Sequence, residues 1–266
     1  MSNTDALIEH LDTNLFELFK LAAVRTGRPC HEGQSYSYVS LSPSPWANTV
    51  FDLDLDGPES AKEIARLIVA GMLPNRVMLG PTSEPAGAAP LLLSAGFVAR
   101  PQARGMILDM SKRRSLCVPE GCELRFLGTE DDREPWAGVV SENLFDAPRS
   151  QAGSAFARVV EAIEGPRAFA AGLYRGGVPV STCFAFIDGS GVGGVYFVST
   201  ERDHRRKGYG AATVSAVLEE LAARKVEHCV LHATALGEPV YENLGFKGAC
   251  ALGRYALGVA GSADRR

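Results

Sequence analysis

Arg205–Gly210, with the sequence RRKGYG, is the stretch of the chain from which the fold can be worked out. The segment before it, 194–200, is apolar and strand-like, and the segment after it, 211–224, repeats apolar residues at helical spacing. The two glycines let backbone N–H groups approach a ligand where a helix N-terminus offers unpaired donors and a positive dipole end. The three basic side chains add charge. The stretch therefore predicts a phosphate-binding loop, and a solvated basic turn is the alternative.

The elements around this loop follow a regular order. Upstream, two strand-like segments flank Arg175–Val178, whose adjacent glycines favour a tight hairpin. Downstream, Pro239–Phe246 reads PVYENLGF and predicts a short helix before a closing strand. The predicted elements of this region are strands at 124–127, 168–174, 179–187, 194–200, 228–234 and 250–257, and helices at 130–143, 154–163, 211–224 and 239–243.

This combination resembles the GNAT superfamily of acetyltransferases. The family carries the motif Arg/Gln-x-x-Gly-x-Gly/Ala between its fourth strand and third helix, and here the motif reads Arg205-x-x-Gly208-x-Gly210. The strand at 228–234 and the segment Val240–Phe246 resemble the family's fifth strand and its tyrosine-containing fourth helix. The resemblance covers about residues 123–257. It implies an α/β (α+β) fold, with a mixed, mainly antiparallel sheet flanked by helices.

The resemblance also implies how acetyl-CoA, the co-substrate, is bound. The loop would cradle its pyrophosphate, and Val198 and Thr200 would offer backbone groups to its pantetheine arm. The asparagine that many members carry after the fifth strand is replaced here, with Thr234 near its place. No metal is expected. The residues assigned to acetyl-CoA are Val198, Ser199, Thr200, Arg205, Arg206, Lys207, Gly208, Tyr209, Gly210 and Ala211.

Direct attack of an amine on the thioester carbonyl is the implied chemistry. The amine must first lose a proton, and a backbone N–H of the splayed strand would stabilise the oxyanion. Tyr241 falls where many members place the general acid that protonates the leaving thiolate; packing beside the pantetheine is the alternative. Glu142 and Glu201 are candidate bases, and proton loss through ordered waters is equally open.

The N-terminal half repeats part of this pattern. Pro90–Phe97, PLLLSAGF, matches Pro239–Phe246 in its proline, its Gly-Phe pair and their spacing. Leu92 stands at the tyrosine position, and Gly57–Ser60 brings an acidic residue to the place of a phosphate. The predicted elements are helices at 4–26, 58–70 and 90–95, strands at 50–55, 76–80 and 106–110, and a loop with short strands at 30–49.

Two similar halves are the economical interpretation. We expect a degenerate GNAT-like domain at 1–111, a connector at 112–122, and a catalytic domain at 123–266 that binds the one acetyl-CoA. The first domain would cover a sheet edge and shape the acceptor pocket between the halves. An unrelated α/β extension is the alternative.

The amino-acid composition limits which classes of binding partner are expected. With 27 Lys+Arg against 31 Asp+Glu, the net charge of −4 argues against a broad nucleic-acid-binding face or an anionic membrane partner. The first residues lack the pattern of a signal peptide, and the six cysteines are scattered without a CxxC. We expect a cytoplasmic enzyme whose acceptor is a small-molecule amine. A protein N-terminal or lysine acetyltransferase and a non-catalytic acyl-CoA-binding sensor are the alternatives, and a homodimer is left open.

Two other motifs are set aside. Gly189–Gly194 reads GSGVGG, a literal GxGxxG, but a strand follows it, so it predicts a hairpin loop and not a dinucleotide site. His228 and His232 stand four residues apart on a predicted strand, where their Cα atoms are about 13 Å apart. They are too far apart to bind one metal ion.

Overall fold

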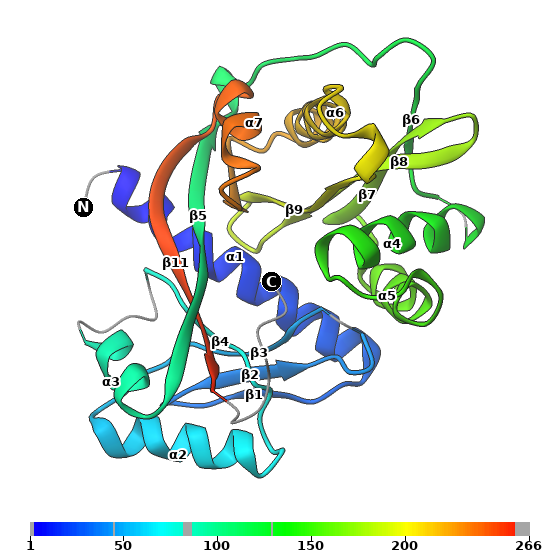
Figure 1. Ribbon diagram of the computed structural model, residues 1–266. Helices are drawn as coiled ribbons and strands as arrows, with labels where there is room; N and C mark the ends of the chain where they lie inside the picture. Colours follow the sequence, from blue (N-terminus) through cyan, green and yellow to red (C-terminus); the bar gives the residue numbers. More distant parts are fainter. Residues whose placement is uncertain (1–2, 45, 82–86, 129, 259–266) are drawn as a thin grey trace.

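Figure 1 shows the computed structural model, which describes residues 3–44, 46–81, 87–128 and 130–258. An eleven-stranded sheet runs through these residues in the order β1-β2-β3-β4-β11-β5-β10-β9-β8-β7-β6. Two neighbouring pairs, β3–β4 and β9–β10, are parallel, and the other paired strands are antiparallel. This mixed, mainly antiparallel sheet flanked by helices confirms the predicted fold class.

None of the described helices is both long enough and apolar enough to cross a membrane.

The elements begin and end close to the predicted positions. The helices are α1 (Asn3–Thr26), α2 (Pro58–Val69), α3 (Ala88–Ser94), α4 (Glu130–Leu144), α5 (Arg149–Ile163), α6 (Tyr209–Ala223) and α7 (Glu238–Asn243). The strands are β1 (Cys30–Glu32), β2 (Ser37–Ser40), β3 (Asn48–Phe51), β4 (Val77–Leu79), β5 (Phe97–Asp109), β6 (Glu123–Phe126), β7 (Ala168–Arg175), β8 (Val178–Ile187), β9 (Gly193–Thr200), β10 (His228–Ala233) and β11 (Lys247–Leu257).

Both faces of the C-terminal strands are covered by helices. On β8, Phe184 and Phe186 point to a core shared with α1, α4 and α5, whereas Cys183 and Ala185 point to a core shared with α6 and α7. Successive side chains of a strand point to opposite faces, so this alternation assigns the two helix pairs to opposite sides of the sheet. A sheet buried on both faces explains why these strands are almost continuously apolar.

Helix α1 connects the two halves of the molecule. Its residues pack on β5, β8, β9 and β10 and also on β1, β2 and α5. The N-terminal strands β3 and β4 have a further core of their own, made with α2 and α3. Asn14 of α1 is fully buried beneath β9, where it donates to Asp188 Oδ2 at 3.0 Å and accepts from the Tyr196 hydroxyl at 2.6 Å. A satisfied buried polar group fixes how the helix lies on the sheet.

The closing strands of the two halves are exchanged. The N-terminal closing strand, β5, pairs with β10 of the C-terminal half, and the C-terminal closing strand, β11, pairs with β4 of the N-terminal half. The two closing strands also pair with each other, from Lys247 opposite Ile107 to Leu257 opposite Phe97. A division at 112–122 therefore separates the chain into halves but does not separate the sheet.

Two predicted strands have different limits in the structure. The strand expected at 50–55 ends at Phe51, because Asp52 has φ of 51° and turns the chain out of the sheet. The strand expected at 106–110 begins at Phe97. Its first part is largely exposed and carries Arg100, Pro101 and Arg104, so it has no apolar alternation by which it could be recognised.

The internal repeat has a structural basis. Gly96 after α3 and Gly245 after α7 have φ of 92° and 104°, and each turns its helix into a closing strand. This backbone region favours glycine. At Gly245 a Cβ atom would also lie 2.7 Å from the carbonyl oxygen of Lys112, so no larger residue fits there without a shift. The predicted hairpin at Gly189–Gly194 is also confirmed, since it joins β8 to β9.

Candidate functional site

A gap opens between β9 and β10 at their carboxyl ends. The two parallel strands pair over three positions, from Cys229 opposite Gly193 to Leu231 opposite Val195. Beyond these positions β9 continues to Thr200 and β10 to Ala233, without further pairing between them. Strand β9 therefore presents backbone donors and acceptors to the gap, and such groups need a partner. The described part of the chain offers none across the gap, so an extended ligand can bind along this edge.

A β-bulge distorts β9 at the start of the gap. Thr182 of β8 is opposite Ser199, but Phe184 is opposite Tyr196, so β9 holds one residue more than β8. Phe197 and Val198 together lie opposite the single residue Cys183. Phe197 has a φ of 51°, which is unusual for an aromatic residue. The Thr182 hydroxyl donates to the Phe197 carbonyl at 2.8 Å. The bulge turns the backbone of the next residue, Val198, out of the regular ladder.

Aromatic packing holds the bulge in place. The Phe197 ring lies 4.8 Å from that of Phe156 and 4.9 Å from that of Trp46, both in T-shaped contacts. Trp46 belongs to the N-terminal half and is buried, with 6% of its surface exposed. A positive φ at a bulky residue costs about 1–3 kcal/mol and persists only where the surroundings enforce it. The N-terminal half thus supports the bulge directly.

The loop before α6 presents backbone donors. Arg206 and Gly208 have φ of 62° and 77°, and Gly208 is the residue that precedes the helix. The first backbone bond into α6 is donated by Ala212 to the Gly208 carbonyl at 2.9 Å. The N–H groups of Tyr209, Gly210 and Ala211 therefore have no helical acceptor, as at any helix start. Unpaired donors at the positive end of a helix dipole suit an anion.

The side chains of the loop differ in what they contact. Arg205 donates to the Thr200 carbonyl at 3.0 Å and to Asn143 Oδ1 at 3.1 Å, so it ties the loop to β9 and α4. The Tyr209 ring is buried, and its hydroxyl accepts from Arg175 at 3.3 Å. Arg206 and Lys207 are exposed like Arg205, and Lys207 donates to the Asp203 carbonyl at 2.8 Å. Arg205 and the Tyr209 ring therefore shape the loop through contacts with β9, α4 and Arg175, whereas Arg206 and Lys207 add charge at its surface.

Tyr241 lies in the core that α6 and α7 form on one face of the sheet. It is on α7, 8% exposed, and its ring contacts Phe246 at 6.0 Å in the same apolar cluster as Cys183 of β8. Burial raises the pKa of the Tyr241 hydroxyl well above its ordinary value. The phenol therefore keeps its proton at neutral pH and can act only as a hydrogen-bond or proton donor to a developing anion. Thr234, near the place of the family's asparagine, accepts from Gly237 N at 3.2 Å and shapes the turn into α7.

The two candidate bases lie together but are engaged. Glu142 and Glu201 both accept hydrogen bonds from Arg149 at the start of α5. Glu201 also accepts from Asn143 Nδ2 at 3.3 Å. A carboxylate paired with a guanidinium is a weaker proton acceptor than a free one. The network joins α4, α5 and the end of β9, which makes it a support for the edge of the gap.

His232 lies where β10 separates from β9, and the sequence pattern did not indicate it as a candidate site residue. It is the next residue after the last β9–β10 pair, and its Nε2 is buried without a hydrogen-bond partner in the described residues. Burial lowers the pKa of this imidazole to about 4, so it is neutral at pH 7. The sequence feature that could have indicated His232 is its position near the end of a predicted strand. Within the described ranges, no three His, Cys, Asp or Glu side chains are grouped as a metal ion would need.

The geometry can now be set beside known proteins. Residues 130–246 match the model of the acetyltransferase (GNAT) family. These residues are a GNAT domain. The match extends from α4 to Phe246, and so includes the bulge, the loop before α6 and Tyr241. The gap between β9 and β10 therefore lies within the GNAT domain, and the fold around it is the one that the sequence predicted.

Solved structures share the fold of the GNAT domain and of the half before it. A GCN5-related N-acetyltransferase from Kribbella flavida is 16% identical, with a TM-score of 0.67 over 93% of this chain and 96% of that chain. A tandem GNAT protein from the clavulanic acid biosynthesis pathway is 17% identical, with a TM-score of 0.58 over 86% and 79%. A GCN5-related N-acetyltransferase from Sphaerobacter thermophilus is 16% identical, with a TM-score of 0.55 over 88% and 83%. No curated protein matches the chain significantly.

Proposed function

We propose that the protein transfers an acetyl group from acetyl-CoA to the amine of a small molecule by direct attack. One observation carries the proposal: a single GNAT domain joins an unpaired strand edge, a bulge and a helix start with unpaired donors around one gap. An extended thioester with a pyrophosphate has the chemistry that such a gap accepts. The family supports acetyl-CoA as the donor.

The proposal gives each part of the gap one task. The N–H groups at the start of α6, with Arg206 and Lys207, bind the pyrophosphate. The edge of β9 from Val198 to Thr200 pairs with the amide groups of the pantetheine arm. The backbone N–H next to the bulge donates to the thioester carbonyl and stabilises the oxyanion that forms. These assignments are predictions that the geometry supports.

The reaction then needs two proton movements. The amine nitrogen attacks the carbonyl carbon after losing a proton, a C–N bond forms, and the C–S bond breaks with its electron pair on sulfur. Tyr241 gives its proton to the leaving thiolate and is reprotonated from solvent. Its burial in the apolar core and its raised pKa both favour the protonated donor form. Ordered waters take the proton of the amine, since Glu142 and Glu201 are bound to Arg149.

A small acceptor is favoured over a folded protein. Helix α1 covers the sheet on the side of α4 and α5, with contacts to β5, β8, β9 and β10. The N-terminal half also reaches the bulge through Trp46. These elements restrict the acceptor side of the gap. A protein N-terminus or lysine, and a sensor that binds acyl-CoA without turnover, are the competing functions.

The N-terminal half is proposed to be a GNAT-like domain that no longer binds the cofactor, with limits at 1–111, and the catalytic domain to span 123–266. Helix α2 of the N-terminal half begins with Pro58 and Glu59, and no basic residues precede it as they precede α6. Leu92 is fully buried at the position that corresponds to Tyr241. Binding of one acetyl-CoA per chain follows from this assignment.

An acceptor screen with detection of the released thiol tests the function. The purified chain is mixed with acetyl-CoA and panels of small amines, peptides with free N-termini and lysine peptides. Thiol release with a small amine supports the proposal. Release with peptides alone would replace it by protein acetylation, and tight acetyl-CoA binding without release in any panel would replace it by sensing.

A further inference from the structure

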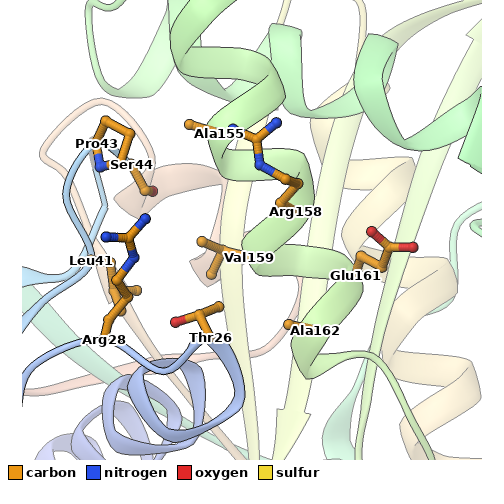
Figure 2. A pocket seen from close by; sticks show the side chains of 10 residues that line it. All are labelled: Thr26, Arg28, Leu41, Pro43, Ser44, Ala155, Arg158, Val159, Glu161 and Ala162. Atoms are coloured by element: carbon orange, nitrogen blue, oxygen red, sulfur yellow. The ribbon is translucent and has the colours of Figure 1, made fainter.

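A second cavity lies outside the candidate site. It has a volume of about 370 Å³ and is lined on one side by the end of α1 and the loop that follows β2, and on the other by α5 (Figure 2). None of its lining residues belongs to the gap between β9 and β10. The cavity therefore joins the N-terminal half to the GNAT domain at a place that acetyl transfer does not explain.

Two guanidinium groups enter this cavity without a counter-ion. Arg28 comes from the wall after α1 and Arg158 from α5, on opposite sides of the cavity (Figure 2). Neither makes an ion pair or a side-chain hydrogen bond with a residue that the structure describes. The one acidic lining residue, Glu161, is 3.7 Å from Arg133 and lies on the far side of α5 from Arg28. The two positive charges are thus available to a bound anion.

The rest of the lining is apolar apart from two hydroxyls, and that of Thr26 already donates to the Ala22 carbonyl at 2.6 Å. Pro43 is exposed and Ala162 is partly exposed, so these two residues offer apolar surface to a ligand, whereas Leu41 and Val159 are already buried. The Ser44 oxygen accepts from Trp46 N at 3.3 Å, which leaves its hydroxyl hydrogen for another acceptor. An apolar wall gains free energy when an apolar group covers it, and a fully hydrated inorganic anion cannot provide that gain.

We propose that this cavity binds a small organic carboxylate with an apolar body, its carboxylate held between Arg28 and Arg158. Guanidinium groups bind carboxylates through paired, charge-assisted hydrogen bonds. The apolar body lies on Pro43 and Ala162. The ligand also touches the loop that carries Trp46, whose ring contacts Phe197 in the bulge. Occupation of the cavity is thereby sensed by the tryptophan.

Titration with sodium hexanoate tests the proposal, and inorganic phosphate and hexylamine serve as comparison probes. Binding is measured by calorimetry and by tryptophan fluorescence, in the absence of acetyl-CoA, so the result is independent of the proposed function. We expect saturable binding of one hexanoate per chain, binding of phosphate at least about tenfold weaker, and no binding of hexylamine. The fluorescence change should disappear in Trp46→Phe.

Matched variants locate the site. Arg28→Gln and Arg158→Gln should each weaken hexanoate binding about tenfold or more, because each removes charge-assisted bonds. Arg25→Gln, another exposed arginine near the end of α1, should leave binding unchanged. All three side chains are exposed, so the variants should fold, as their melting temperatures will check. Unchanged hexanoate binding in both Arg28→Gln and Arg158→Gln would overturn the proposal. The absence of saturable hexanoate binding, or an equal affinity for phosphate, would also overturn it. Loss of binding in Arg206→Gln would overturn it as well, because it would place the carboxylate in the loop before α6.

Discussion

The strands β9 and β10, joined by α6, and the strands β3 and β4, joined by α2, are two versions of the same parallel unit. In the GNAT domain three residue pairs join the strands before they separate, whereas β3 and β4 share only the pair Val50–Val77. Helix α6 begins after a basic loop that ends in Gly208, and α2 begins with a proline and a glutamate. Proline has no N–H to donate, and a carboxylate at a helix start repels a phosphate. The fold supplies two similar frames, and we expect the few residues at the start of each helix to decide which frame binds a polyanion.

The largest expected effect concerns the residue that differs between the two short helices. Tyr241→Phe keeps the ring and removes the hydroxyl, so kcat should fall by about 10²–10⁴-fold while the Kd of acetyl-CoA stays within a few-fold. The matched change in the other half, Leu92→Met, should leave kcat unchanged. Steady-state kinetics and calorimetry measure both. A loss below about threefold in Tyr241→Phe would reduce the tyrosine to a packing residue.

The next test compares the two helix starts. Gly208→Asp places a carboxylate where the pyrophosphate is proposed to bind, and should weaken acetyl-CoA binding by about 100-fold or more and abolish the rise in Tm with ligand. Gly57→Asp makes the same change before α2 and should have no effect on binding. Calorimetry of the unchanged chain should give one site. A second equivalent at saturation would mean that both frames are functional.

His232 should make the GNAT domain sensitive to acid. Burial lowers its pKa from 6.5 to about 4, so the unfolded chain binds more protons between these values and the free energy of unfolding falls as pH drops below 6.5. The expected loss at pH 5, relative to pH 8, is about 2 kcal/mol. Urea unfolding at several pH values measures it. His232→Gln should remove this dependence and His228→Gln on the same strand should keep it; equal slopes in the two variants would count against the buried imidazole.

The smallest expected effect tests how far the halves cooperate. Trp46→Phe removes part of the aromatic contact from the N-terminal half to Phe197, and one such contact is worth about 0.5–1.5 kcal/mol. We expect a fall in kcat/KM of about threefold to tenfold and a small loss of Tm. Val24→Ala on exposed α1 surface is the matched control and should change neither. A full kcat/KM in Trp46→Phe would show that the bulge does not depend on the N-terminal half.

Local patterns were enough to predict most elements, the loop before α6 and the position of Tyr241, because each rests on neighbours in sequence. The bulge was not predictable, since it depends on Thr182 and Phe156, which meet Phe197 only in the folded sheet. The same holds for Arg205: its charge suggested a phosphate ligand, but its position directs it to Asn143 and Thr200. Side-chain roles set by long-range contacts cannot be deduced from spacing alone.

The exchange of the closing strands also places a condition on synthesis of the chain. Strand β4 leaves the ribosome early, yet its neighbour β11 is made after all the other described strands. Until then one edge of the N-terminal sheet has unpaired backbone groups, which is the state in which strands associate wrongly. Strand β5 likewise waits for β10. The two halves therefore cannot fold one after the other as independent domains. The sheet of the first half is complete only when the second half has been made.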